Sequence, residues 1–294
     1  MSVAVVVSAP GKVNLTLDIL GRRPDGYHEI ATVMQAVTLA DTVTLTPDAS
    51  GRLSLSIHGV PLPPDEKNTA CVAARRFWEY IGAPESGLHI RLDKRVPMQA
   101  GMAGGSADAA GVLVGLNALT GAGLTSEELC AIGARVGADV PFCVRGGTAL
   151  ATGTGTEMTP LPPLPECTIV LAKPPIGVST AAAYAAIDRA PRLRHPDNEA
   201  MRQALERGAL ASIGRLMGNV FEQALALPEV ERLAVAVAAF APLGCCMTGS
   251  GSVVFALFDD ADAAARCAAA LRTYADAAAV FSCHPCHHGA QVIG

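Results

Sequence analysis

Alternation of apolar and polar residues dominates the first hundred positions of the chain. Five segments there are β-branched or repeat with a period of two, and Gly, Pro and Asp turns separate them: 3–7, 13–20, 30–38, 42–47 and 53–57. In 42–46 and 53–57 the alternation is clean, which is typical of antiparallel strands buried on one face. A further strand is expected at 88–92. These patterns predict a strand-rich N-terminal half.

Helical segments interrupt these strands. Asn68 is a candidate cap for a helix that runs to residue 80, and a further helix is expected at 126–136. Between them, Ser106 and Asp108 suit the N-cap or first turn of an alanine-rich helix over 109–119. The proline-rich segment 161–165 is the strongest break in the pattern. It predicts a domain junction, with one domain at 1–160 and a second at 161–294.

Beyond this junction, strands and helices follow one another irregularly. Strands are expected at 168–172, 245–248, 253–258 and 280–283, and helices near 180–188, 197–207, 230–240 and 261–274. Strand–strand–helix order lacks the regular alternation of βαβ units. The pattern therefore favours an α+β fold over a doubly wound parallel sheet.

Charge and cysteine content narrow the class of protein. A net charge of −5 argues against a general nucleic-acid binder, so local cations and backbone donors must hold any anionic ligand. Nine scattered cysteines predict reduced thiols and a cytoplasmic location, and no signal peptide or membrane-spanning run is expected. The cluster Cys283-His-Pro-Cys-His-His288 lacks a second pair of ligands. We therefore expect no metal site formed by the chain.

A glycine-rich loop leads into the alanine-rich helix, in the segment Pro97-Met-Gln-Ala-Gly-Met-Ala-Gly-Gly-Ser-Ala-Asp-Ala-Ala-Gly111. Its glycines allow a tight backbone that comes close to a ligand. Free N–H groups at a helix start, with the positive end of the helix dipole, bind anions, and phosphate is the anion we expect. The spacing fits neither a Walker A loop nor the dinucleotide motif. The alternative is an ordinary turn that caps a helix.

Three further segments carry candidate chemistry. Lys12 and Asn14 are two apart in a strand and so share a face, although a solvated edge strand would explain them too. Tyr27 and His28 follow a Pro-Asp-Gly turn, where they either bind a planar base or form part of a charged hairpin. Asp139, expected between a helix end and a strand, is costly to bury without a cation, and Lys12 is the candidate. The alternative is a turn-forming aspartate.

The small-residue turn Met247-Thr-Gly-Ser-Gly-Ser-Val-Val254 lies between two expected strands. Such a turn either lets another backbone approach closely, here the glycine loop, or is a tight hairpin. Together with Ala9-Pro-Gly-Lys-Val-Asn14 and residues 97–110, Thr248-Gly-Ser-Gly251 resembles the three motifs of the GHMP kinase superfamily, in order. Met102 stands where that family usually has Leu, a change that conserves volume and apolarity.

The resemblance implies a two-domain kinase that phosphorylates a small alcohol with ATP. Its N-terminal domain would be like domain 2 of ribosomal protein S5, and its C-terminal domain would be a ferredoxin-like α/β sandwich. Segments 21–30, 137–142 and 178–184 are similar to the branch whose substrate carries cytidine diphosphate on methylerythritol. That branch transfers phosphate to the 2-hydroxyl, in the non-mevalonate route to isoprenoid precursors.

The resemblance also implies a role for each candidate residue. Asp139 would accept the hydroxyl proton while Lys12 orients the hydroxyl and offsets the developing charge. The nucleotide would be bound, with its Mg²⁺, by Asn68, Lys94, Pro97, Met98, Gln99, Ala100, Gly101, Met102, Ala103, Gly104, Gly105, Ser106, Ala107, Asp108, Thr248, Gly249, Ser250 and Gly251. The substrate would be bound by Asn14, Tyr27, His28, Thr180 and Tyr184, the cytosine by Tyr27 and His28.

Two other functions are compatible with the motifs. One is a GHMP kinase for another alcohol, such as mevalonate or homoserine, against which the Asp-Gly-Tyr-His segment argues. The other is a catalytically silent relative that binds ligand, which would have no need of both Lys12 and Asp139. In each case the expected partners are small molecules, with no nucleic acid or membrane, and the protein is expected to be a monomer or a homodimer.

Overall fold

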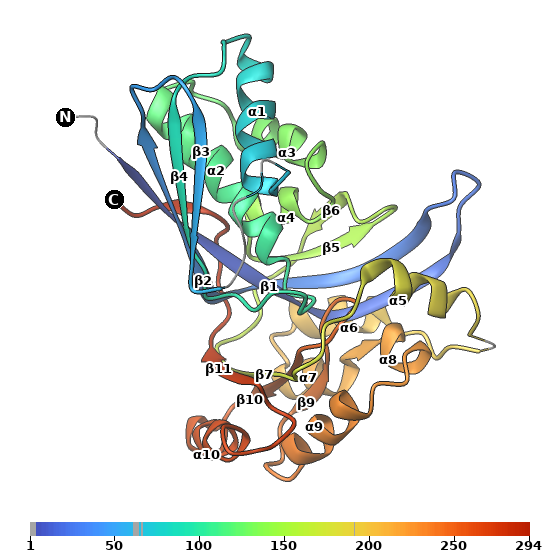
Figure 1. Cartoon of the computed structure of the whole chain (residues 1–294). Helices are drawn as coiled ribbons and strands as arrows, with labels where there is room; N and C mark the ends of the chain where they lie inside the picture. Colours follow the sequence, from blue (N-terminus) through green and yellow to red (C-terminus); the bar gives the residue numbers. More distant parts are fainter. Residues whose placement is uncertain (1–3, 61–64, 66, 191) are drawn as a thin grey trace.

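Two long antiparallel strands cross the molecule in the computed structural model, which describes residues 4–60, 65, 67–190 and 192–294 (Figure 1). β1 (Val5–Arg22) has 18 residues and β2 (His28–Pro47) has 20. The sequence pattern predicted two shorter strands in place of each, and Val3, in the first of them, lies outside the described residues. The chain stays extended through Pro10 and Gly11 because irregularities in the β1–β2 register, one of them between Pro10 and Lys12, accommodate the step.

β1 and β2 are the centre of an eight-stranded sheet among the described residues. β2 pairs with β4 (Leu88–Asp93) and with β5 (Thr148–Thr152), which pairs in turn with β6 (Glu157–Pro160). β1 pairs with the short strands β8 (Gly218–Asn219) and β12 (Gln291–Val292). The division into domains at residue 160 stays a prediction, and both of these short strands come from beyond it.

The edge strand β3 (Leu53–His58) corrects one expectation. It pairs with β4 in parallel, so the prediction of an antiparallel strand at 53–57 is wrong. Helix α1 (Thr69–Ile81) lies between β3 and β4 in the chain, and such a long connection permits the parallel crossover. Asn68 accepts a hydrogen bond from the Ala70 N–H, which confirms it as the cap of α1.

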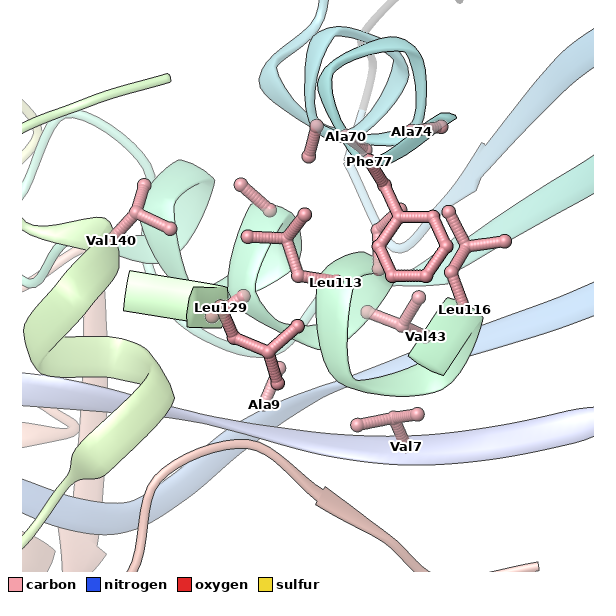
Figure 2. Close-up of a cluster of buried hydrophobic side chains, with 14 of the residues drawn as sticks. Val7, Ala9, Val43, Ala70, Ala74, Phe77, Leu113, Leu116, Leu129 and Val140 are labelled. Carbon is pink, nitrogen blue, oxygen red and sulfur yellow. The ribbon is translucent and has the colours of Figure 1, made fainter. Parts of the chain in front are cut away.

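Four helices gather on one side of the large sheet (Figure 1). They are α1, α2 (Gly104–Thr120), α3 (Ser126–Ala134) and α4 (Val140–Arg145). Figure 2 shows the core that they form with the sheet, including Val43, Phe77 and Leu113, which are all buried. α2 lies so close to the strands that a Cβ built on Gly111 would be 2.7 Å from Val43 Cγ2. The small residues of α2 are thus required by its packing.

A second, four-stranded antiparallel sheet has the order β11 (Ala279–Cys283), β7 (Thr168–Lys173), β10 (Val254–Phe258), β9 (Gly244–Met247). One face packs against α5 (Thr180–Ile187), α8 (Val220–Ala224), α9 (Pro228–Ala238) and α10 (Ala261–Leu271). The other face packs against β1, β2, α6 (Asn198–Glu206) and α7 (Leu210–Leu216). β1 and β2 contribute to both halves of the core. Both sheets therefore support the region where β1 and β2 pass between them.

The described part of the chain also bears on membrane and disulfide expectations. None of its helices has the length and apolar composition needed to span a bilayer. Its nine cysteines are all present as thiols, not as disulfides.

Candidate active site

A cavity of about 710 Å³ opens where the glycine loop meets β1, β2 and the start of α5. Nearly all of the predicted site residues line it. They are Lys12, Asn14, Asn68, Lys94, Pro97, Met98, Gln99, Ala100, Gly101, Met102, Ala103, Gly104, Gly105, Ser106, Asp108, Asp139, Thr180, Tyr184, Gly249, Ser250 and Gly251. Segments that are far apart in the sequence therefore share one site.

The glycine loop presents the start of helix α2 to this cavity. Ala103 is the N-cap residue, in a left-handed conformation with φ 57°, and its side chain makes no capping bond. Since α2 begins at Gly104, Ser106 lies in the first turn, one of the two positions predicted for it, whereas Asp108 lies beyond the first turn and neither residue is the N-cap. Gly104 and Gly105 are the first residues of the helix and line the cavity. The N–H groups of this first turn have no partner within the helix. With the helix dipole, they form an anion site.

The third motif packs directly on the glycine loop. A Cβ built on Gly101 would lie 2.0 Å from the Thr248 carbonyl oxygen, and one built on Gly249 would lie 2.7 Å from the Gly101 Cα. The predicted close approach of two backbones is confirmed. Thr248 and Ala107 are themselves fully buried and do not line the cavity. Thr248 instead supports the wall, since its hydroxyl shares its proton between the Gly101 carbonyl oxygen at 3.3 Å and Asn14 Oδ1 at 3.1 Å.

Asn14 connects the first motif to the third. Its Oδ1 accepts hydrogen bonds from Lys12 Nζ at 2.6 Å, Gly249 N at 2.9 Å and Thr248 Oγ1 at 3.1 Å. Its Nδ2 donates to Thr32 Oγ1 at 2.8 Å. The side chain was predicted to bind substrate, but most of its hydrogen-bonding capacity is used within the protein. What it does in this geometry is fix the Lys12 ammonium.

Lys12 and Asp139 face the same cavity but form no ion pair with each other. The buried Lys12 ammonium donates to Asn14 and to the Gly101 carbonyl oxygen at 2.8 Å. Asp139, half-buried, occupies the N-cap position of α4 without making a capping bond. The segment after it was expected to be a strand and is helical, with Pro141 in its first turn. The Asp139 carboxylate is thus left available to a ligand.

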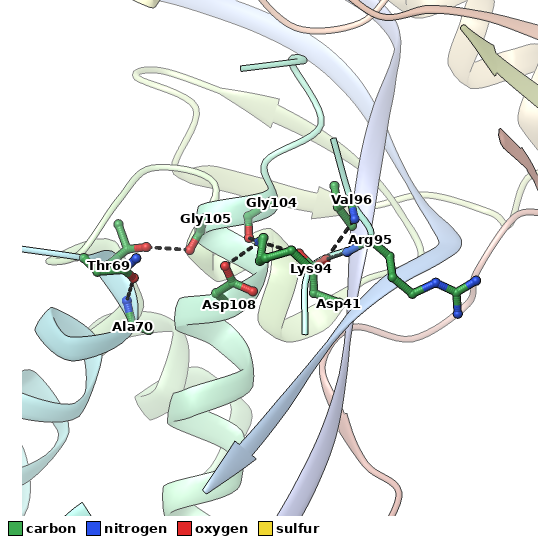
Figure 3. A network of polar contacts seen from close by, with 10 residues as sticks. Asp41, Thr69, Ala70, Lys94, Arg95, Val96, Gly104, Gly105 and Asp108 are labelled. Carbon is green, nitrogen blue, oxygen red and sulfur yellow. Dashed lines mark hydrogen bonds and ion pairs between the residues drawn. The ribbon is translucent and has the colours of Figure 1, made fainter. Parts of the chain in front are cut away.

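Lys94 belongs to a buried network beside the glycine loop (Figure 3). Its Nζ lies 2.5 Å from Asp41 Oδ2 and 2.5 Å from Asp108 Oδ2. Asp41 Oδ1 also accepts the backbone N–H of Val96 at 2.8 Å. The network ties β2, the segment after β4 and α2 together, so the Lys94 charge is largely neutralised by protein carboxylates. Burial raises the pKa of Asp108 to about 7, a rise that Lys94 opposes and Asp41 strengthens.

A cluster of aromatic side chains forms the part of the cavity wall that contains Tyr184 and Phe221. His28 stacks on Tyr184 with ring centroids 4.6 Å apart, and Phe221 meets the Tyr184 ring edge-on at 5.2 Å. His28 Nε2 lies 2.7 Å from Asp188 Oδ1, and this hydrogen bond lowers the pKa of Asp188. His28 therefore supports Tyr184 rather than lining the cavity itself. Tyr27 also lies outside the lining and is 67% exposed.

Sequence reasoning missed several residues that hold the loops. Asn219 Nδ2 donates to the carbonyl oxygens of Met247 at 2.7 Å and Gly249 at 2.8 Å. Thr69 Oγ1 donates to the Gly105 carbonyl oxygen at 2.8 Å. Asp41 had a usable signal, because a lone carboxylate in an apolar strand needs a cation. Asn219 and Thr69 had none, since their partners are distant in the sequence.

The fold and this site define a small-molecule kinase of the GHMP class. The model of the GHMP kinase N-terminal domain matches residues 68–147, and that of the GHMP kinase C-terminal domain matches 201–277. These matches confirm the predicted fold class, with its mixed helix and sheet content.

Individual relatives that match most of the chain narrow the assignment within this class. A 4-diphosphocytidyl-2-C-methyl-D-erythritol kinase from Geobacillus sp. (strain WCH70) is 41% identical over 274 residues, 92% of this chain and 94% of the relative. One from Exiguobacterium sibiricum is 44% identical over 272 residues, with the same coverage of 92% and 94%. The chain belongs to the 4-diphosphocytidyl-2-C-methyl-D-erythritol kinase family.

Solved structures agree with this assignment. A crystal structure of 4-(cytidine 5'-diphospho)-2C-methyl-D-erythritol kinase superposes with a TM-score of 0.80 at 35% identity, covering 95% of this chain and 98% of the other. A homoserine kinase from Cytophaga hutchinsonii reaches a TM-score of 0.74 at 23% identity, covering 99% of this chain and 97% of the other. At that identity the likeness shows the fold alone.

Proposed function

We propose that the protein transfers the γ-phosphoryl group of ATP to the 2-hydroxyl of 4-diphosphocytidyl-2-C-methyl-D-erythritol, releasing ADP. The observation that carries this proposal is that the Lys12 ammonium, the Asp139 carboxylate and the start of α2 line a single cavity. The family supports the reaction, and the aromatic wall around Tyr184 suits a cytidine nucleotide. The reaction belongs to the non-mevalonate route to isoprenoid precursors.

Each polar group then has a chemical task. The first N–H groups of α2 hold the triphosphate, and Asn68 lies at the same end of the cavity. Asp139 accepts the proton of the acceptor hydroxyl, and Lys12 orients that hydroxyl and stabilises the charge that develops on the transferred group. Thr180 and Tyr184 bind the substrate, with Tyr27 and His28 on the cytosine side. Of these, Tyr27 must move from its exposed position to reach the base.

Mg²⁺ enters the proposal as part of the nucleotide. The described part of the chain contains no group of three or more His, Cys, Asp or Glu side chains able to hold a metal ion. The anion site at α2 does suit a nucleotide that carries its own cation, and Mg²⁺ would supply charge neutralisation between the phosphate oxygens. We place the enzyme in the cytoplasm as a monomer or homodimer. Its partners would be ATP and the sugar alcohol, with no nucleic acid or membrane.

An acceptor panel tests the substrate. ADP release is coupled to a spectroscopic assay, and 4-diphosphocytidyl-2-C-methyl-D-erythritol, mevalonate and homoserine are compared as acceptors. We expect release with the cytidylyl substrate and a value of kcat/KM at least about a thousandfold lower with the other two, because they leave the polar groups of the cytidine wall unpaired. Equal rates with mevalonate or homoserine would assign another acceptor, and no release with any of them would indicate a silent relative.

A further inference from the structure

Asp108 carries an unsatisfied oxygen next to the nucleotide site. Among the residues that the structure describes, Asp108 Oδ1 is the only buried side-chain nitrogen or oxygen without a hydrogen-bond partner. The residue is 3% exposed and belongs to the cavity wall. A carboxylate oxygen in this position loses its hydration and gains nothing in return. A proton on Oδ1 would neutralise the charge and so lower that cost.

The charges around Asp108 do not balance. One ammonium, on Lys94, serves two carboxylates, so the group formed by Asp41, Lys94 and Asp108 has a formal charge of −1 (Figure 3). Asp41 is stabilised as an anion because its second oxygen accepts the N–H groups of Arg95 and Val96. The excess negative charge therefore falls on Asp108, in accord with the rise in its pKa to about 7 that burial causes.

No second cation in the described part of the chain forms an ion pair with Asp108. Cys143, on the neighbouring helix α4, is held neutral because burial raises the pKa of its thiol well above the ordinary value. Lys12 is committed to Asn14 and Gly101 on the other side of the loop. Asp139 adds a further negative charge to the cavity. Phosphates bound at the start of α2, one turn before Asp108, would add more still.

We propose that Asp108 takes up one proton on Oδ1 when the phosphates of the nucleotide bind. The proton comes from solvent, and the net charge of Asp41, Lys94 and Asp108 together changes from −1 to zero. The inference rests on the proposed function, because it places the phosphates at the start of α2. Since binding raises the proton affinity of Asp108, nucleotide affinity falls as the pH rises past the pKa of about 7 in the free protein.

Calorimetry of ADP binding tests this directly. Magnesium-free ADP is titrated into the full chain at about pH 8, in buffers of different ionisation heat, and the dependence of heat on buffer gives the protons taken up. We expect the wild type to take up a substantial fraction of a proton, and its affinity to fall by up to about tenfold per pH unit above neutrality. Asp108→Asn should take up none, and its affinity should no longer fall with pH. Asp259→Asn, which changes an exposed carboxylate outside the cavity, is the control and should behave as the wild type.

The outcomes separate this inference from the proposed function. ADP binding without proton uptake by the wild type, or unchanged uptake by Asp108→Asn, overturns the inference alone. Failure to bind ADP at any pH overturns the proposed function and the inference with it. Infrared difference spectra of the wild type, which need no variant, should gain a protonated carboxyl band when ADP binds. The absence of that band contradicts the proposal even if Asp108→Asn does not fold.

Discussion

At the scale of single residues, the site depends on side chains that hold one another in place before a ligand arrives. Asn14 accepts hydrogen bonds from Lys12 and from the third motif, so the ammonium has one favoured position. Asp139, by contrast, has neither a capping bond nor an ion pair with Lys12. One group is preorganised and the other is left free to react, which is what a general base beside a fixed cation requires.

Replacing Asp139 with asparagine removes the proposed proton acceptor and keeps the shape of the side chain. We expect kcat to fall by about 10²- to 10⁴-fold, the range that general-base catalysis contributes, with little change in ATP affinity. Turnover by coupled ADP release and binding by calorimetry measure the two effects. Asp259→Asn, at an exposed position after β10, is the matched control and should keep wild-type kcat. Wild-type turnover by Asp139→Asn would remove this residue from the mechanism.

Replacing Asn14 with leucine should affect stability and turnover together. The change removes the shared buried acceptor of the Gly249 N–H, the Lys12 ammonium and the Thr248 hydroxyl, and the last two keep only the Gly101 carbonyl oxygen as acceptor. Such losses cost about 3 kcal/mol in the free energy of unfolding, measured by urea denaturation. Thr32→Val removes the acceptor of Asn14 Nδ2 and the donor to the Thr16 carbonyl oxygen, keeps Asn14 Oδ1 with all of its donors, and should cost about 2 kcal/mol. A stable Asn14→Leu variant with normal kcat would show that Asn14 does not orient Lys12.

At the scale of elements, contacts between loops and helices give the cavity its shape. Gly101, with φ 74°, has the Thr248 carbonyl directly where a side chain would begin. The segment after β4 is joined to β2 and α2 through Lys94. These contacts are backbone proximity in one case and buried charge in the other, so they respond to different substitutions.

Gly101→Ala should open the contact between the second and third motifs. The new Cβ cannot occupy a position 2.0 Å from a carbonyl oxygen, so one loop must move, and KM for ATP should rise at least about tenfold. Gly82→Ala is the control, because Gly82 has a similar φ of 65° but no atom within 4 Å of its added Cβ. It should lose only about 1 kcal/mol of stability and keep its KM. Equal KM values in the two variants would mean that the loop contact does not shape the site.

Lys94→Met should destabilise the molecule more than an ordinary surface change. Removing the ammonium leaves two buried carboxylates facing each other, which costs about 3–5 kcal/mol at neutral pH. The loss should shrink as the pH falls, because protonation removes the charge of a buried carboxyl. Denaturation midpoints measured across pH for the wild type and the variant test this. A loss that does not vary with pH would point to packing rather than charge.

The elements also show how far sequence reasoning reaches. The cap of α1 and the loops of the second and third motifs depend on local chemistry, so Asn68 and the segments around Gly101 and Gly249 could be found in the sequence. The continuous β1 and β2, and the parallel pairing of β3, could not, since they depend on partners distant in the chain. The same reason hid Asn219. The hydrogen bond of Asn14 to Gly249 was hidden as well, because the two residues are 235 positions apart.

At the scale of the whole molecule, one pair of strands organises both halves. β1 and β2 pack against helices α1–α4 on one side and against the second sheet on the other (Figure 1). The cavity lies where these layers meet, so that α2 contributes the anion site while α5 and α8 contribute the aromatic wall. We expect nucleotide and sugar alcohol to bind from opposite halves of the molecule, with Lys12 and Asp139 between them.

The position of the transferred phosphate tests the central claim most directly. Purified protein is incubated with ATP, Mg²⁺ and 4-diphosphocytidyl-2-C-methyl-D-erythritol, and the products are followed by ³¹P NMR. The proposed site predicts a new phosphomonoester on the 2-hydroxyl, formed in equal amount to ADP. ADP formed with inorganic phosphate alone, or a phosphate on another hydroxyl, would contradict it.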